Sequence, residues 1–119
     1  MSRALFSPLS LRELTLANRI VVSPMCQYSA EDGSAGDWHL MHLGNLSISG
    51  PGLVMVEATA VEPRGRITYG DLGLYSDDNE AALRRIVSFC RQYGGSRLGL
   101  QLAHAGRKGS DHLLSLIHI

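Results

Sequence analysis

Three short segments of this 119-residue chain place polar or reactive side chains directly after an apolar run. They are residues 23–28 (Ser-Pro-Met-Cys-Gln-Tyr), 57–60 (Glu-Ala-Thr-Ala) and 101–108, which opens on Gln101. The segments carry a thiol, carboxamides, hydroxyls and small side chains, which are groups that can bind and orient a ligand. Ligands of parallel α/β folds gather at the carboxyl ends of strands. We therefore predict that the three segments meet at one ligand site.

The elements that position these segments can be read from hydrophobic periodicity. Apolar and polar residues alternate over residues 9–11 and 14–16, which predicts a hairpin. The β-branched run 20–22 predicts a strand that ends at Ser23-Pro24, because proline cannot continue a central strand. The continuous apolar run at residues 53–56 predicts a strand buried on both faces, and residues 98–102 predict a third strand.

Two helices are predicted between these strands. Asp37 is the expected N-cap of a helix that starts at Trp38 and stops at residues 50–52, Gly-Pro-Gly. A second helix opens at residues 76–80, with Asp77 and Glu80 as a capping box, and ends at residues 94–95. The expected inner positions are Leu40, Leu43 and Leu46 in the first helix and Leu83, Ile86, Val87, Cys90 and Tyr93 in the second.

Helices that alternate with fully apolar strands indicate parallel βαβ units, so the fold class is α/β. An open doubly wound sheet and a closed barrel both fit this order. A Rossmann fold would place G-x-G-x-x-G directly after its first strand, and residues 23–28 hold Ser-Pro-Met-Cys-Gln-Tyr instead. No nucleotide phosphate is expected at that turn.

Composition excludes several classes of function. Eleven basic and eleven acidic residues give a formal net charge of zero, and without a basic patch no nucleic-acid partner is expected. The N-terminus lacks the apolar core of a secretory signal, and no run of about 18 apolar residues occurs, so no membrane partner is expected. The two cysteines, Cys26 and Cys90, are predicted to be free thiols in a reducing, cytoplasmic compartment.

Several residues have a structural reading beside a functional one. His39 and His42 lack a third ligand at metal spacing, so we expect them to cap or pack the first helix and predict no metal. For His104 and the neighbouring basic pair, anion binding and a structural loop role stay open. Met25, Met41 and Met55 are expected to be packing residues. Arg64 and Arg66 are expected to be solvated loop charges, and Cys90 is expected to be a core thiol.

Five blocks of the sequence, in order and at matching spacing, resemble the Old Yellow Enzyme family of FMN-dependent ene-reductases. The blocks are residues 18–28, 37–44, 56–61, 65–68 and 101–108, and the likeness runs from about Leu5 to Gly109. The chain is most similar to the bacterial NADPH dehydrogenase and xenobiotic-reductase branch, in which a cysteine follows the Pro-Met pair. This resemblance implies a TIM (β/α)₈ barrel, of which the hairpin and the three strands with two helices would be the N-terminal portion.

The resemblance also implies roles for particular residues. FMN would be contacted by the loop Ser23, Pro24, Met25 and Cys26, by Ala60 and by Gln101. A carboxamide offers both a donor and an acceptor to the polar edge of the flavin ring, and Cys26 matches a thiol that tunes flavin redox behaviour. Tyr28 matches a residue at the substrate mouth. No catalytic residue is assigned, because the family's carbonyl-binding pair and proton-donating tyrosine would lie beyond residue 110.

The implied activity is that of a longer parent enzyme. NADPH would reduce bound FMN, which would then reduce the C=C bond of a small electrophilic alkene, such as an enone or a xenobiotic, in a ping-pong cycle. A homo-oligomer is expected. Two alternatives stay open: a related flavin barrel with an iron–sulfur module, of the dienoyl-CoA reductase type, and an inactive truncated product.

The length of the chain adds an expectation about its end. A (β/α)₈ barrel needs roughly 250 residues. Residues 114–119, Leu-Ser-Leu-Ile-His-Ile, read like a translated library adapter. We therefore expect residues 1–112 to be the front of an FMN-binding barrel and residues 113–119 to be a non-native tail. Three strands leave an open edge and half a core, so the isolated chain is expected to fold poorly and to bind FMN weakly or not at all.

Overall fold

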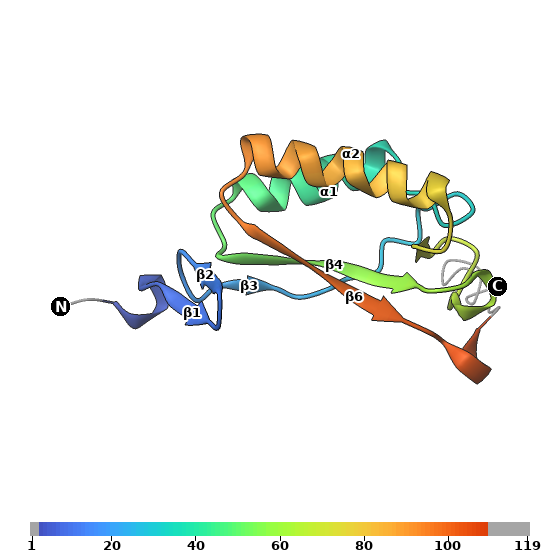
Figure 1. Cartoon of the computed structure of the whole chain (residues 1–119), viewed down its shortest axis with the longest axis horizontal. Helices are drawn as coiled ribbons and strands as arrows, with labels where there is room; N and C mark the ends of the chain where they lie inside the picture. The colour runs from blue at the N-terminus through green and yellow to red at the C-terminus, as the bar shows by residue number, and fades with distance from the viewer. Residues whose placement is uncertain (1–2, 110–119) are drawn as a thin grey trace, which may run out of the picture.

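A hairpin precedes a parallel α/β unit in the computed structural model, which describes residues 3–109 (Figure 1). The hairpin pairs β1 (Leu9–Leu11) with β2 (Leu14–Leu16) in antiparallel fashion. The strands and helices then follow as β3 (Val21–Val22), α1 (Asp37–Ile48), β4 (Leu53–Ala60), α2 (Asp77–Tyr93) and β6 (Arg97–Ala103). This order confirms the predicted hairpin and βαβ units. The predicted non-native tail, residues 113–119, lies outside the described residues.

Four short elements were not expected from the sequence. They are the 3₁₀ turns η1 (Ala4–Phe6), η2 (Pro63–Gly65) and η3 (Gly106–Lys108) and the two-residue strand β5 (Leu72–Gly73). Each spans only two or three residues, too few to show a hydrophobic period. β5 matters for the fold because it pairs with the end of β4 and so closes that edge of the strand.

β4 is the central strand of the sheet. One edge of β4 pairs with β3 and, further along, with β5, and β6 pairs with its other edge, all in parallel. The ladder between β4 and β6 shifts register between Val56 and Ala58, which leaves Glu57 as the extra residue of a β-bulge. The expectation that this strand ends at residue 56 is wrong, because the bulge absorbs Glu57 and pairing continues to Ala60.

Both helices cover the same face of the sheet (Figure 1). The core lies between them and the sheet, and its members include Val54, Leu72, Ile86 and Cys90, each at most 1% exposed. Burying such side chains contributes roughly 1.5–3 kcal/mol each. The predicted inner positions Leu43, Leu83, Ile86 and Cys90 are buried, and Leu40 and Leu46 pack partly against them.

The helix starts differ from the sequence prediction. Asp37 is the first residue of α1 and Gly36 is its N-cap, and the Gly36 N–H donates to Nδ1 of His39 at 3.1 Å. In α2 the N-cap is Ser76, whose hydroxyl oxygen accepts the Asn79 N–H at 3.2 Å. Each predicted cap was therefore placed one residue too late, because an acid in the first turn suits the helix dipole as well as a cap position does.

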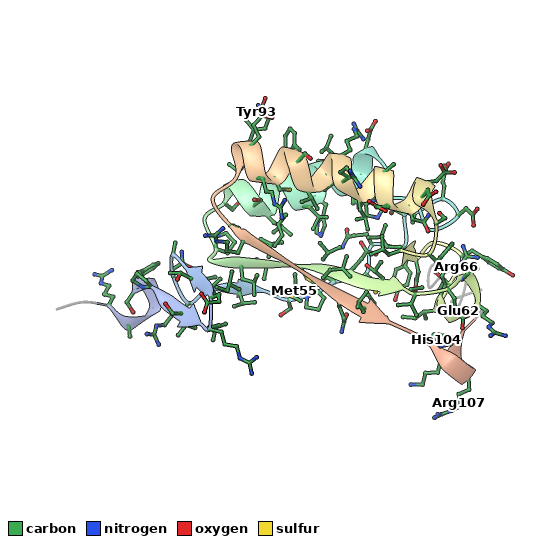
Figure 2. All side chains as sticks on the ribbon, viewed as in Figure 1. Met55, Glu62, Arg66, Tyr93, His104 and Arg107 are labelled. Carbon is green, nitrogen blue, oxygen red and sulfur yellow. The ribbon has the colours of Figure 1, made fainter. Side chains whose placement is uncertain are left out.

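The far end of α2 also departs from the prediction. Tyr93 is 60% exposed and points away from the sheet, where it packs against Phe89 with 4.9 Å between the ring centroids (Figure 2). Gly94, the next residue, takes the inward position, since a Cβ there would lie 1.9 Å from Oγ of Ser47. The tight approach of this turn to α1 therefore leaves no room for a large inward side chain.

The face of the sheet opposite the helices is largely bare. Met55 lies on this face (Figure 2) and covers Gly99, where a Cβ would lie 2.3 Å from the Met55 sulfur. Neighbouring residues in register share a face, so Ala58 and Gln101 lie side by side here, followed by Ala60 and Ala103.

Among the described residues no helix is long and apolar enough to cross a membrane.

Candidate functional site

The three predicted ligand-binding segments meet at one level of the sheet. The 23–28 segment lies beside β4, where the Gln27 N–H donates to Oε2 of Glu57 at 3.1 Å and the backbone of Ala58 is among the groups that lower the pKa of the Cys26 thiol. Ala58 is in register with Gln101 on the other side. The 23–28 segment, which follows β3, and Gln101 of β6 therefore lie on either side of β4. The predicted convergence is thus present in the structure.

The environment of Cys26 keeps its thiol protonated. Burial raises the pKa of Cys26 above its ordinary value, and the negative charges of Asp71 and Glu57 raise it further, against hydrogen bonds with Ala58 and Tyr28 that lower it. Burial and the neighbouring Cys26 likewise raise the pKa of the Tyr28 hydroxyl. The site therefore offers a neutral, polarizable S–H next to a neutral phenol, and does not offer a thiolate nucleophile.

Tyr28 also has an unusual backbone. Its φ of 52° lies in the left-handed region, which a non-glycine residue adopts at a cost of roughly 1–3 kcal/mol. Such a conformation persists only where the surroundings fix it. Here the Ser29 hydroxyl donates to the Gln27 carbonyl at 2.9 Å and the Ala30 N–H donates to the Gly70 carbonyl at 2.9 Å. Both bonds hold the segment on either side of Tyr28.

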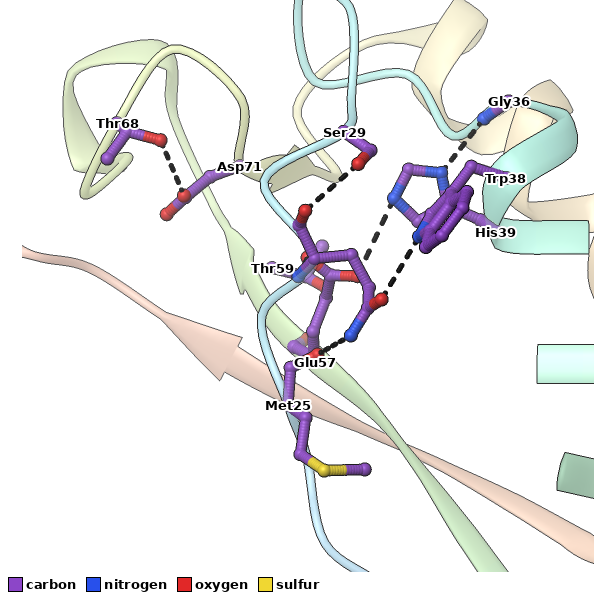
Figure 3. Close-up of polar contacts among 10 residues, drawn as sticks. Met25, Ser29, Gly36, Trp38, His39, Glu57, Thr59, Thr68 and Asp71 are labelled. Carbon is purple, nitrogen blue, oxygen red and sulfur yellow. Dashed lines mark hydrogen bonds and ion pairs between the residues drawn. The ribbon is translucent and has the colours of Figure 1, made fainter. Parts of the chain in front are cut away.

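Gln27 connects the 23–28 segment to the first helix and to β4, and its partners Met25, Trp38 and Glu57 are labelled in Figure 3. The Trp38 indole N–H donates to its Oε1 at 3.0 Å, and its Nε2 donates to the Met25 carbonyl at 2.9 Å. Its backbone N–H donates to Oε2 of Glu57 at 3.1 Å. The residue between Cys26 and Tyr28 is therefore fixed by three separate contacts.

Glu57 and His39 form a buried pair behind this segment. The two side chains are 3% and 0% exposed, and Oε1 of Glu57 lies 3.5 Å from Nε2 of His39, a contact whose geometry falls short of a hydrogen bond. Burial lowers the pKa of His39 and raises that of Glu57 to about 7, although the Gln27 hydrogen bond opposes the second shift. His39 caps α1, as predicted, because its Nδ1 accepts the Gly36 N–H. In the neutral ring the proton is therefore on Nε2.

Asp71 adds a second buried carboxyl group. It is 2% exposed, and its oxygens accept the Ile67 N–H at 2.8 Å and the Thr68 hydroxyl at 3.1 Å (Figure 3). Its negative charge is one of the causes that raise the pKa values of Cys26, Tyr28 and Glu57. The site is therefore electrostatically negative behind the loop, which favours neutral groups on the side of the bare face.

The predicted site residues differ in how accessible they are. Ser23 and Gln101 are exposed and Met25 is 47% exposed, whereas Pro24, Cys26 and Tyr28 are half-buried. Ala60 shares the face of Gln101 but is only 2% exposed. Their individual roles towards a cofactor stay predictions. The sequence reasoning did not assign Gln27 or Glu57, although an acid that follows four apolar residues, as Glu57 does, was an available signal.

Three expectations for other residues are wrong. Arg66 is not a solvated charge: its side chain is 14% exposed, lies 5.5 Å over the Tyr69 ring and pairs with Asp32 at 3.7 Å. Met25 and Met41 are not packing residues, since about half of each is exposed. Arg64, at 85% exposure, is solvated as expected.

His104 takes a structural position in this structure. Its Nε2 lies 2.6 Å from Glu62 (Figure 2), and its Nδ1 accepts the Gly106 N–H at 3.0 Å. Both ring nitrogens are thus engaged, one with the loop that follows β4 and one with the loop that follows β6. Of the two readings left open for this histidine, these contacts favour the structural one.

The bare face fits the chemistry of a flavin. Met25 and Pro24 offer apolar contact to a ring, and the exposed Gln101 carboxamide has no hydrogen-bond partner among the described residues. The residues at positions 58, 60, 99 and 103 are alanine or glycine, so no long side chain projects from this part of the bare face. An apolar surface with one free donor–acceptor group matches a ring that has an apolar body and a polar edge.

Comparison with known proteins gives a consistent result. The sequence model of the NADH:flavin oxidoreductase / NADH oxidase family, which is named for FMN, matches residues 4–115. An NADH:flavin oxidoreductase of Gibberella zeae is 50% identical over 109 residues, covering 92% of this chain and 26% of its own length. An NADPH dehydrogenase of Geobacillus sp. is 47% identical over 110 residues, covering 91% and 32%. The chain thus spans about a third of the length of these relatives, or less.

Solved structures of the same kind share the fold. Morphinone reductase in complex with tetrahydroNAD superposes with a TM-score of 0.83 at 30% identity, covering 91% of this chain and 29% of its own. The old yellow enzyme from Trypanosoma cruzi gives a TM-score of 0.76 at 36% identity, covering 89% and 28%. These are TIM-barrel enzymes, so the sheet and helices described above correspond to part of such a barrel. The chain belongs to the NADH:flavin oxidoreductase / NADH oxidase family, among the Old Yellow Enzymes.

Proposed function

We propose that the full-length protein represented by this chain is an FMN-dependent NADPH oxidoreductase that reduces activated C=C bonds in small molecules such as enones. Family membership supports a flavin-dependent oxidoreductase, and the NADPH dehydrogenase relatives support a nicotinamide as reductant. The observation that carries the proposal is the meeting of the 23–28 segment, Ala58 and Gln101 on the bare face of the sheet. The proposed substrate is a small electrophilic alkene. We also propose that the full-length enzyme is a homo-oligomer and that it is cytoplasmic.

The residues of this chain would hold and tune the cofactor. Ser23, Pro24, Met25 and Cys26 would pack along the ring, Gln101 would bond its polar edge, and the small Ala60 would leave room for it. Tyr28 would contribute to the substrate mouth. When bound, FMN supplies hydride transfer from NADPH to the alkene in two half-reactions.

The proposed role of Cys26 follows from its protonation. Because its pKa is raised, the group that faces the ring is S–H, which is polarizable and a weak hydrogen-bond donor. Such a donor stabilises added negative charge on a reduced ring without reacting with it. Burial is the main reason that the thiolate is disfavoured, and the two carboxyl groups behind the loop, Asp71 and Glu57, add to it.

A chimera tests this function directly. Residues 1–109 of this chain would replace the matching segment of the Geobacillus NADPH dehydrogenase, with the unaltered enzyme as control. We expect the chimera to consume NADPH in the presence of 2-cyclohexenone and to form cyclohexanone. A chimera that holds flavin and oxidises NADPH with oxygen alone, and never forms the saturated ketone, would contradict the alkene substrate.

A further inference from the structure

Glu57 is the residue around which this inference is built. It is the extra residue of the β-bulge in β4, skipped by the pairing of Val56 with Leu100 and of Ala58 with Gln101. A bulge re-aims a side chain, and bulges are frequent beside functional sites. Without the bulge, residue 57 would alternate with Val56 and point to the bare face. With it, the carboxyl group is buried at the back of the 23–28 segment.

The carboxyl group joins three elements. One oxygen accepts the Gln27 N–H from the 23–28 segment at 3.1 Å, and the other faces the Nε2 proton of His39 in α1 at 3.5 Å. Both neighbours are donors, because His39 uses Nδ1 to accept the Gly36 N–H. Glu57 thus holds the segment against β4 through the Gln27 N–H, and its second oxygen faces His39 of α1 (Figure 3).

We propose that Glu57 is a positioning residue: its carboxyl group docks the 23–28 segment by accepting the Gln27 amide proton, and so sets where the Cys26 thiol lies beside β4. Gln27 directly follows Cys26, so a shift of the first moves the second. The docking itself depends only on contacts within this chain. Its consequence for the flavin rests on the proposed function.

Docking should weaken as pH rises. Burial raises the pKa of Glu57 from 4.5 to about 7, so the docked segment binds a proton that a solvated carboxyl group releases. The docking equilibrium therefore falls as pH rises from 4.5 to about 7, by up to about two orders of magnitude, and above this window the carboxylate is ionised in both states. The titratable groups that face Glu57 are His39, Asp71, Cys26 and Tyr28. The pKa of His39 is lowered and those of Cys26 and Tyr28 are raised, so these three titrate away from pH 7.

Trp38 provides a direct probe. It is the single tryptophan of the chain, and its indole N–H donates to the Gln27 side chain at 3.0 Å. We expect the tryptophan emission of the chain to change between pH 5.5 and 8.5 with a midpoint near 7. Glu57→Gln keeps an acceptor but cannot ionise, so its emission should stay constant. Glu62→Gln, a matched change at a partly exposed carboxyl group, should keep the transition.

The two cysteines give a second measurement that does not depend on fluorescence. Glu57→Val removes both the acceptor and the charge that raises the Cys26 pKa, whereas Glu57→Gln removes only the charge. We expect iodoacetamide to label Cys26 at least about tenfold faster at pH 7 in Glu57→Val than in Glu57→Gln. Cys90, 1% exposed in the core, should keep its slow rate and so reports that the fold is intact. If Cys90 of the wild-type chain labels rapidly, the chain is unfolded alone and the same comparison is made in the chimera with the Geobacillus enzyme.

Two outcomes would overturn the proposal. One is a transition near pH 7 that persists in Glu57→Gln. The other is equal labelling of Cys26 in Glu57→Gln and in Glu57→Val while Cys90 stays protected. Neither readout requires flavin or NADPH, so a failure of the proposed function would leave these results intact, and a failure here would leave flavin binding to be judged separately.

Discussion

The two faces of the parallel sheet differ in what completes them. On the helix-covered face Val54, Leu72 and Ile86 are at most 1% exposed, because α1 and α2 come from the same stretch of sequence and close over them. On the opposite face Val21 is 49% exposed and Gln101 is open. The first face is a core that this chain makes by itself. The second is the surface to which the proposed function assigns the flavin.

The largest effect that separates the two faces is on stability. Ile86→Ala on the covered face should lower the free energy of unfolding by about 3–4 kcal/mol, since it removes a buried side chain and leaves a cavity. Val21→Ala on the bare face should cost less than about 1 kcal/mol, because half of that side chain is already in water. Urea unfolding followed by circular dichroism measures both. Similar losses for the two variants would mean that the bare face is packed as a core.

The second prediction concerns the pH dependence of stability. The pKa of Glu57 is about 7 in the folded chain and 4.5 in the unfolded reference, so the folded state binds more protons between these values. The stabilisation from its protonated form is fully present below pH 4.5 and is lost as pH rises through 7, by up to about 3 kcal/mol. Glu57→Gln should flatten the curve of unfolding free energy against pH over this window. A curve that keeps its full slope in the variant would assign the effect to other groups.

The smallest predicted effect lies on the bare face itself. Cys26→Ala in the chimera should shift the flavin reduction potential by a few tens of millivolts, because the S–H donor is lost from the loop. Flavin binding should change little, since Pro24 and Met25 still pack along the ring. Cys90→Ala is the control within the core and should leave the potential where it is. An unchanged potential in Cys26→Ala would remove the tuning role from this thiol.

The same contrast explains what could be predicted from the sequence. The hairpin, the strands and both helices followed from periodicity, which reports burial against neighbours close in the chain. The bulge at Glu57 could not be predicted, because it exists only in the register between β4 and β6. The role of Gln27 was missed for a related reason, as its partners Trp38 and Glu57 lie 11 and 30 residues away.

Some errors came from reading residue types without their surroundings. Arg66 was expected in water, but Tyr69 and Asp32 cover it in a loop whose shape no periodic pattern reports. Tyr93 was expected inside, but the close packing of Gly94 on Ser47 turns it outward. The helix caps were misplaced by one residue, which is within the ordinary uncertainty of helix ends.

The central claim is that this chain supplies a flavin-binding face, and the flavin content of the chimera tests it most directly. After desalting, the absorbance near 450 nm should show about one FMN per chimeric chain, as in the parent Geobacillus enzyme. Gln101→Leu should weaken FMN binding by about tenfold, the effect of one lost hydrogen bond of roughly 1.4 kcal/mol. A folded chimera that is colourless, or a Gln101→Leu variant that binds FMN as tightly as the wild type, would contradict the account.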